Sequence, residues 1–95
     1  MIRVDWSERK SRLNALKHNV TFEEAQTIFD DPSHLTVADP DHSIGETRFI
    51  TIGFSDRNRL LIMAHTFEND KIRLISARKP TRSERRRYEE GVFDA

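Results

Sequence analysis

The spacing of apolar and polar positions changes at Pro32, and this change divides the chain into a helical part and a β part. Before Pro32, the pattern predicts a helix that is capped by Ser7 and runs to about His18. Leu13 and Leu16 are expected to face inward, because they are the long apolar residues of this helix. Asn19 follows as a residue suited to a left-handed helix end.

A second helix is predicted immediately after this turn. Residues 21–24 read Thr-Phe-Glu-Glu, which is typical of a capping box between the threonine and glutamate side chains. This helix should continue through Ile28 and Phe29 and end at Pro32, which cannot extend it. Two helices joined by so short a turn predict an N-terminal helical hairpin.

The remaining chain up to Ala77 has the composition of β-strands. Ile-, Leu- and Phe-rich segments predict a peripheral strand and then three longer ones, at 34–38, 47–54, 59–67 and 71–77. A loop is expected at 40–45. The short polar connections at 55–58 and 68–70 predict an antiparallel meander, and residues 3–6 are the segment that adds a further strand.

The C-terminal part begins with a second capping box, Thr81-Arg82-Ser83-Glu84, which predicts a helix to about Gly91 and a frayed tail from Val92. Together these elements predict an α+β fold. It is an antiparallel β-sheet meander with an N-terminal helical hairpin and a C-terminal helix. Ninety-five residues make one domain, residues 1–95.

Charge is segregated along the chain, although its net charge is zero. Residues 71–87 hold eight Lys and Arg and one Glu, whereas residues 19–46 hold seven acids and neither Lys nor Arg. A net charge of zero argues against non-specific binding along duplex DNA, because such binding requires many cations. A focused basic segment suits a short stretch of phosphodiester. Pairing of the acidic and basic segments within the fold is the alternative explanation.

Other kinds of chemistry find little support. There is no cysteine for a disulfide or thiolate site, and four scattered histidines do not form a metal-binding motif. The three glycines are isolated, so no phosphate-binding loop is predicted. We therefore expect no cofactor and no metal. Without a secretion signal or an apolar run of membrane-spanning length, the expected location is the cytoplasm and no membrane contact is expected.

The arginines near the predicted strand end are the main candidates for function. Arg78 lies where the strand ends before Pro80, and Arg73 lies within the strand. Regular alternation would place Arg73 on one face with Ala77, and Arg78 on the other. We expect guanidinium groups to converge at this β-to-α junction as an anion site open to solvent. On the last helix, Arg82, Arg85 and Tyr88 can follow Arg78 along one side.

RNA carries its own nucleophile in the 2′-hydroxyl group, so its cleavage needs charge stabilisation and proton transfer but neither a metal nor a nucleophilic side chain. The candidates for proton transfer are His18, His65, Glu84 and Tyr88, with Lys17 as an electrostatic helper. Structural roles compete with these: Glu84 completes a capping box, His18 ends a helix, and residues 85–87 suit a solvated helical face.

An ordered set of motifs from Val4 to Glu90 resembles the BrnT family of bacterial type II toxins. The resemblance rests on Trp6, Asn14-Ala15-Leu16-Lys17-His18-Asn19-Val20-Thr21-Phe22-Glu23-Glu24-Ala25, Phe29-Asp30-Asp31-Pro32, Arg48-Phe49-Ile50-Thr51-Ile52-Gly53, Arg73-Leu74-Ile75-Ser76-Ala77-Arg78 and Glu84-Arg85-Arg86-Arg87-Tyr88. The sequence departs from the family pattern at Ser7, Asn19 and Pro80, where aspartate, glycine and alanine are frequent. Pro80 is expected to affect the direction of the last helix and therefore the geometry around Arg78.

The resemblance implies a fold like that of the RelE ribonucleases and a ribonuclease that depresses translation. It also implies a BrnA antitoxin with a ribbon-helix-helix DNA-binding domain, so that the toxin forms a hetero-oligomer and meets operator DNA only through the antitoxin. The positions that match the polar motifs of the family are Lys17, His18, Arg48, Arg73, Arg78, Glu84, Arg85 and Tyr88. Arg48, Arg82 and Arg85 are assigned to RNA binding and the others to catalysis.

Two hypotheses follow for function. The first is a metal-independent endoribonuclease toxin in which arginines hold and neutralise the phosphate. The second is a non-catalytic binding module that acts as the antitoxin's partner and transcriptional co-repressor. A small ribbon-helix-helix reading frame immediately downstream would place the chain in the toxin–antitoxin class.

Overall fold

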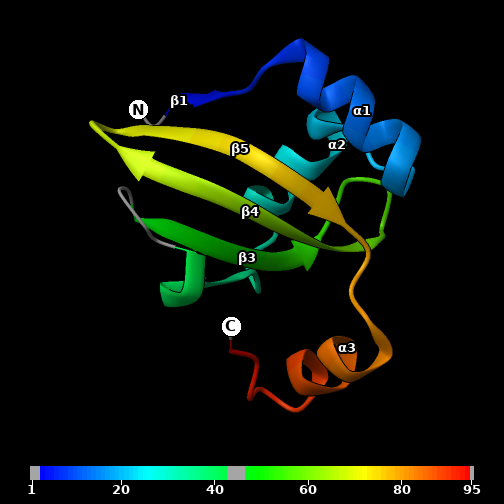
Figure 1. Ribbon diagram of the computed structural model, residues 1–95. Coiled ribbons are helices and arrows are strands. Elements are labelled where there is room, and N and C mark those ends of the chain that lie inside the picture. The colour runs from blue at the N-terminus through cyan, green and yellow to red at the C-terminus, as the bar shows by residue number, and fades with distance from the viewer. Residues whose placement is uncertain (1–2, 43–46, 95) are drawn as a thin grey trace.

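Helices lie on both faces of a five-stranded sheet, in a computed structural model that describes residues 3–42 and 47–94 (Figure 1). The strands are β1 (Arg3–Asp5), β2 (Leu35–Ala38), β3 (Arg48–Phe54), β4 (Leu60–Glu68) and β5 (Lys71–Arg78). The α-helices are α1 (Glu8–His18), α2 (Phe22–Gln26) and α3 (Arg82–Glu89), and the short 3-10 helices are η1 (Thr27–Asp30) and η2 (Pro40–His42).

The sheet has the strand order β1-β5-β4-β3-β2. Strands β2 to β5 pair antiparallel, which confirms the predicted meander and the peripheral place of β2. The predicted additional strand at residues 3–6 forms as β1, and it makes the sheet mixed, because β1 pairs parallel with the start of β5. The 3-10 helix η2 occupies the start of the predicted 40–45 loop, whose last three residues lie outside the described residues. None of the described helices is long and apolar enough to cross a membrane.

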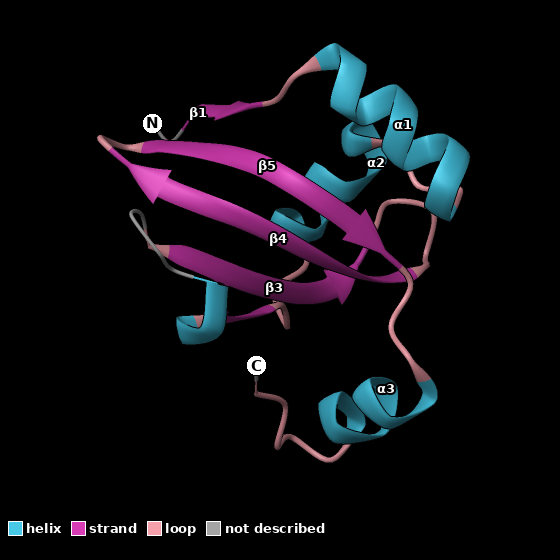
Figure 2. Cartoon of the chain, in the orientation of Figure 1, coloured by secondary structure: helices cyan, strands magenta, loops and turns pink. Residues whose placement is uncertain are grey.

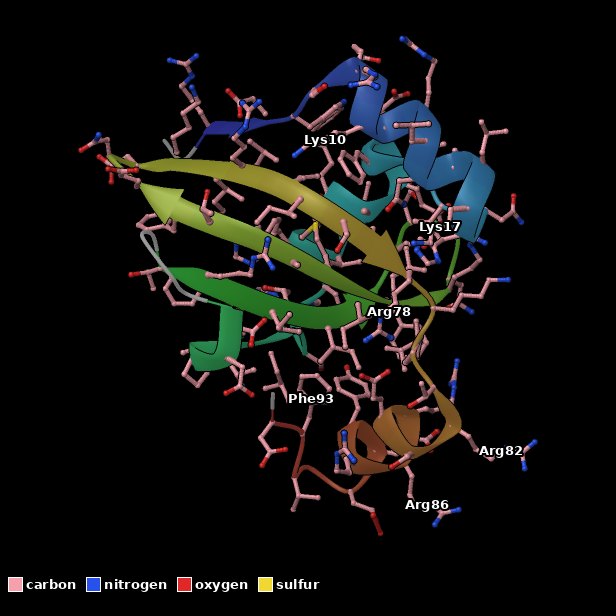
Figure 3. All side chains as sticks on the ribbon, in the orientation of Figure 1. Lys10, Lys17, Arg78, Arg82, Arg86 and Phe93 are labelled. Carbon is pink, nitrogen blue, oxygen red and sulfur yellow. The ribbon has the colours of Figure 1, made fainter. Side chains whose placement is uncertain are left out.

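The two faces of the sheet carry separate apolar cores. On one face, Val20, Phe22 and Ile28 from the helical region pack against Leu61, Met63 and Leu74. On the other face, Phe93 packs with Ile52, Leu60 and Ile62, and Tyr88 adds to this cluster. The tail predicted to fray is therefore anchored at Phe93, which is only 8% exposed. Figure 2 shows the C-terminal segment on the opposite side of the sheet from α1, and Figure 3 shows Phe93 between this segment and the sheet.

Helix α1 buries its polar side, contrary to the prediction. Leu13 and Leu16 are 52% and 85% exposed, whereas Ser11 and Asn14 are buried. The Asn14 amide nitrogen donates to the carbonyl oxygens of Val20 and Ala77, both at 2.8 Å, and its oxygen accepts from the Ala77 N–H at 3.0 Å. These bonds outweigh the burial of a leucine, because they satisfy backbone groups that are shielded from water.

Asn14 also completes the edge of the sheet. Strand β1 covers β5 only from Lys71 to Arg73, so the backbone of Ala77 lies beyond its reach. The side chain of Asn14 supplies one donor and one acceptor to Ala77, as a neighbouring strand would. The end of β5 is thereby fixed to α1.

A β-bulge in β5 changes which residues share a face. Ala64 pairs with Ser76, but His65 pairs with Leu74, so Ile75 has no partner. Ala77 consequently joins the helix-facing core, and Arg78 pairs with Ile62 on the opposite face. The alternation predicted from the sequence holds before the bulge and reverses after it.

Only half of the first predicted capping box forms. The hydroxyl of Thr21 accepts from the Glu24 N–H at 3.1 Å, but the Glu24 carboxylate turns away to Arg59 and Ser55. Arg59 also donates to the Asn19 carbonyl at 3.1 Å. The predicted left-handed conformation of Asn19 is confirmed, with φ at 58°. This network joins the turn between α1 and α2 to the connection between β3 and β4.

We expect Asn14→Ala to lower the free energy of unfolding by about 3 kcal/mol, because buried backbone groups of Val20 and Ala77 lose their partners. Urea unfolding followed by circular dichroism measures this change. Leu13→Ala is the control and should change stability by less than about 0.5 kcal/mol, because that side chain is exposed. A larger loss in Leu13→Ala than in Asn14→Ala would contradict the orientation of α1.

Candidate active site

An open groove of about 550 Å³ lies between the end of α1 and the junction of β5 with α3. Its walls are Leu16, Lys17, His18, Asn19, Arg78, Lys79, Pro80 and Thr81. Three side chains predicted to act in catalysis, those of Lys17, His18 and Arg78, therefore meet here, although sixty residues of sequence separate the two walls. Figure 3 shows Lys17 and Arg78 on these two elements.

The first wall is the carboxyl end of a helix. Lys17 and His18 occupy the last turn of α1, where cations are favoured by the negative end of the helix dipole. The N–H of Asn19 donates to the Ala15 carbonyl at 2.9 Å and closes the helix. Asn14, one turn earlier, fixes this wall relative to β5.

The second wall presents Arg78 in a fixed orientation. Its two terminal nitrogens donate to the two carboxylate oxygens of Glu84 at 2.8 and 3.0 Å, and one of them also donates to the Lys79 carbonyl at 3.2 Å. An arginine has five N–H donors, so two remain for a ligand. The Arg78 side chain is 41% exposed and lines the groove.

Glu84 caps helix α3 and binds Arg78. Its carboxylate accepts from the Thr81 N–H at 2.8 Å, and Thr81 caps the helix in return, so the second predicted capping box is confirmed. The hydrogen bonds from Arg78 are the main cause that lowers the pKa of Glu84 to about 2, and the Thr81 N–H adds to this. The same pair raises the pKa of Arg78.

Arg73 and Arg48 lie at a different part of the sheet. Both pair with Thr66 across adjacent strands, so the three side chains share a face. Because of the bulge this is also the face of Arg78, five residues and about 15 Å further along β5. Arg73 forms a salt bridge of 3.4 Å with Asp5, which also binds Lys71 at 2.9 Å. The expected convergence of Arg73 with Arg78 is not found.

The remaining candidates on α3 do not line the groove. Tyr88 donates to the Ser33 carbonyl at 3.3 Å and contacts the Phe54 ring, and burial raises the pKa of its hydroxyl group. Arg82 and Arg85 are exposed, and Figure 3 shows Arg82 pointing away from the sheet, like Arg86. His65 is buried against Phe29 and Phe49, with its Nε2 2.7 Å from the Thr51 hydroxyl.

Sequence reasoning missed Lys79 and the exposed Leu16 as parts of the groove. Lys79 directly follows Arg78, so the end of the strand was a signal that could have found it. Leu16 gave the opposite signal, since an apolar helical residue is normally read as core.

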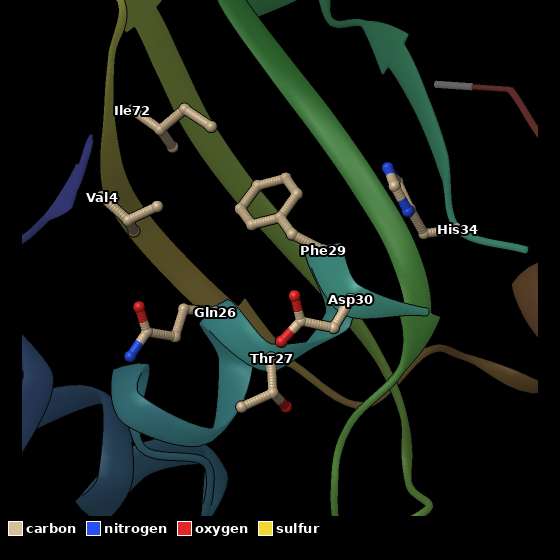
Figure 4. Close-up of a pocket in the computed structure, with 7 residues that line it drawn as sticks. All are labelled: Val4, Gln26, Thr27, Phe29, Asp30, His34 and Ile72. Atoms are coloured by element: carbon tan, nitrogen blue, oxygen red, sulfur yellow. The ribbon is translucent and has the colours of Figure 1, made fainter. Parts of the chain in front are cut away.

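A second cavity, of about 600 Å³, lies between η1, β1 and β5 (Figure 4). It is lined by Val4, Gln26, Thr27, Phe29, Asp30, His34 and Ile72. With one carboxylate and neither Lys nor Arg in its walls, it is poorly suited to a phosphodiester. Among residues 3–42 and 47–94, no three His, Cys, Asp or Glu side chains gather as a metal site.

Comparison with protein families identifies the class of protein. A family model described as "Ribonuclease toxin, BrnT, of type II toxin-antitoxin system" matches residues 6–84, and these toxins act with an antitoxin partner. The chain belongs to this BrnT family, as the resemblance predicted.

The structural comparison agrees in fold. The structure is similar to the crystal structure of the ribonuclease toxin BrnT from Brucella abortus, with a TM-score of 0.64 and 17% sequence identity. The similarity covers 86% of this chain and 100% of that one. At this identity it supports the α+β fold alone. A search of curated protein sequences finds no match.

We expect Glu84→Gln to cost about 1 kcal/mol of stability at pH 7. The folded-state pKa of Glu84 is about 2, below its ordinary value of 4.5. The stabilisation is therefore present above pH 4.5 and is lost as the pH falls toward 2. The difference in the free energy of unfolding between wild type and variant, measured with urea from pH 7 to 2, should shrink over this range.

Glu89→Gln is the matched control, because Glu89 is an exposed glutamate of the same helix. A difference between wild type and Glu84→Gln that stays constant from pH 5 to pH 2 would show that the ion pair does not favour the ionised carboxylate.

Proposed function

We propose that this ribonuclease toxin is an endoribonuclease that cuts RNA without a metal, by attack of the 2′-hydroxyl on the adjacent phosphate. The bond between phosphorus and the 5′-oxygen breaks, and the products are a 2′,3′-cyclic phosphate and a 5′-hydroxyl end. The observation that supports this best is the groove that Lys17 and His18 line from α1 and Arg78 lines from the end of β5.

Arg78 is assigned to the scissile phosphate. Its two remaining N–H donors are assigned to the non-bridging oxygens, where negative charge develops as the phosphorus becomes pentacoordinate. Glu84 is a positioning residue: with a pKa of about 2 it is ionised at neutral pH, so it holds Arg78 and does not donate a proton. Lys17 and His18, on the opposite wall, are assigned to charge stabilisation and proton transfer.

The other basic positions are assigned to the RNA on either side of the cleaved bond. Arg48 and Arg73 share the face of the sheet on which Arg78 lies, and Arg73 is about 15 Å from Arg78 along β5. Arg82 and Arg85 are exposed on α3 and contact RNA further out. Tyr88 supports α3 through its contacts with Ser33 and Phe54.

In the cell, RNA cleavage would depress translation in the cytoplasm. The partner that neutralises it is a BrnA-like antitoxin with a ribbon-helix-helix domain, so that the pair forms a hetero-oligomer and reaches operator DNA through the antitoxin. Membership of a family of type II toxins supports an antitoxin partner, and the kind of antitoxin is part of this proposal. The proposal also extends the family resemblance to a fold like that of the RelE ribonucleases.

The ion pairs of the two β5 arginines favour a second function, that of a binding module with weak catalysis. Both arginines of β5 are paired with acids of the same molecule, Arg78 with Glu84 and Arg73 with Asp5. An arginine that is already neutralised binds phosphate less strongly. A toxin of this kind with weak catalysis would act mainly as antitoxin partner and co-repressor. RNA that stays intact with the purified chain, together with tighter operator binding by its partner, would support this alternative.

Arg78→Ala should abolish growth arrest and lower the rate of RNA cleavage by about 10²- to 10³-fold, as expected for loss of one donor to the transition state. Growth after induction without antitoxin and cleavage of labelled RNA measure the two effects. Arg86→Ala is the matched control, since this exposed arginine points away from the sheet. Full toxicity in a stable Arg78→Ala variant would refute the role of Arg78.

Cleavage should continue at the same rate in excess EDTA, because the 2′-hydroxyl supplies the nucleophile and cationic side chains supply the charge. Substrates with a 2′-deoxy group at the cleavage site should resist. Loss of activity in EDTA with recovery on adding Mg²⁺ would show that a metal takes part.

A further inference from the structure

Helix α1 shows an apolar surface to solvent that its own fold does not use. Leu13 and Leu16 are three residues apart, so they lie on the same face of the helix, and they are 52% and 85% exposed. The opposite face of α1 is occupied by Ser11 and Asn14, whose side chains bond to the backbone. Figure 1 shows α1 at the periphery of the molecule.

The leucines are surrounded by positive charge. Arg9 and Lys17 lie four residues before and after Leu13, and Arg12 lies four residues before Leu16. All three cations are exposed. Among residues 3–42 and 47–94, none of the three forms a salt bridge. We call Leu13, Leu16 and these three cations the α1 surface.

We propose that the α1 surface is where the antitoxin binds, through an amphipathic helix that places apolar side chains on Leu13 and Leu16 and carboxylates beside Arg9, Arg12 and Lys17. This inference rests on the proposed function, which supplies the antitoxin. Pairing of amphipathic helices uses this combination of apolar anchors at helical spacing and complementary charged flanks.

Other occupants fit the α1 surface less well. In a symmetric contact with a second copy of this chain, the same cations would face one another and repel. RNA would be attracted by the cations, but aliphatic leucines offer its bases no aromatic platform for stacking. An acidic and apolar protein segment satisfies both features.

The position of the α1 surface also explains how binding would inhibit the toxin. Leu16 and Lys17 belong both to this surface and to the groove that contains Arg78. A helix seated on Leu13 and Leu16 would therefore cover one wall of the groove and neutralise Lys17. RNA would be excluded without any change in the Arg78–Glu84 pair.

The test is Leu13→Glu, because Leu13 is in the α1 surface but does not line the groove. Val92→Glu is the matched control, an apolar residue 59% exposed at the other end of the molecule. The antitoxin used is the partner encoded with this toxin, for which the proposed function assigns a ribbon-helix-helix domain. Leu13→Glu should arrest growth like the wild type and no longer be rescued by co-expressed antitoxin, whereas Val92→Glu should be rescued.

Affinity is measured by calorimetry in an Arg78→Ala background, which permits expression of all variants. Leu13→Glu should bind the antitoxin at least tenfold more weakly, and Arg12→Glu should bind more weakly with a smaller dependence on salt. Normal rescue and unchanged affinity of Leu13→Glu would overturn the proposal. So would a folded Leu13→Glu chain that binds antitoxin normally but no longer cleaves RNA, because the surface would then serve the substrate.

Failure of the proposed function gives a different result. If the wild type neither arrests growth nor cleaves RNA, the ribonuclease assignment fails, and calorimetry still decides this inference. A tenfold loss of affinity in Leu13→Glu, with Val92→Glu unchanged, supports it, and equal affinities of all three chains overturn it.

Discussion

The three hydrogen bonds of Asn14 are the constraint on which the site depends. They connect the middle of α1 to the backbone of Ala77, at the end of β5 that no strand covers. Because Lys17 and His18 follow Asn14 by one turn, and Arg78 follows Ala77 directly, fixing the first pair of residues fixes the two walls of the groove. A buried amide with three satisfied bonds is specific in position as well as stabilising.

The same hydrogen bonds determine which face of α1 is exposed to solvent. A helix that turns Ser11 and Asn14 toward the protein must turn its leucines toward solvent. The exposure of Leu13 and Leu16 is therefore a consequence of how α1 is attached. The end of the helix lines the groove, and its exposed leucines form the surface proposed for the antitoxin, with Leu16 and Lys17 common to both.

The Arg78–Glu84 pair joins the start of α3 to the end of β5 at the proposed active site. Thr81 and Glu84 begin α3 by capping each other, and the same carboxylate holds the arginine that ends β5. The junction is thus stiff where the phosphate is expected to bind. The pair uses only part of the hydrogen-bonding capacity of Arg78, so the guanidinium group is held in one orientation while two of its donors have no partner among the residues that the structure describes.

Features that depend on neighbouring residues were determined by the sequence itself. The capping box at Thr81, the left-handed Asn19 and the meander of β2 to β5 follow from local conformational preference and alternation, and the ordered motifs identified the family. Tertiary structure decided the rest, because the competing partners are distant in sequence. The carboxylate of Glu24 binds Arg59 and therefore does not cap its own helix. Asn14 is buried in place of the leucines because it forms hydrogen bonds with the backbone of Ala77. The bulge at Ile75 places Arg78 on the same face as Arg73. Regular alternation of side chains along a strand would place the two arginines on opposite faces.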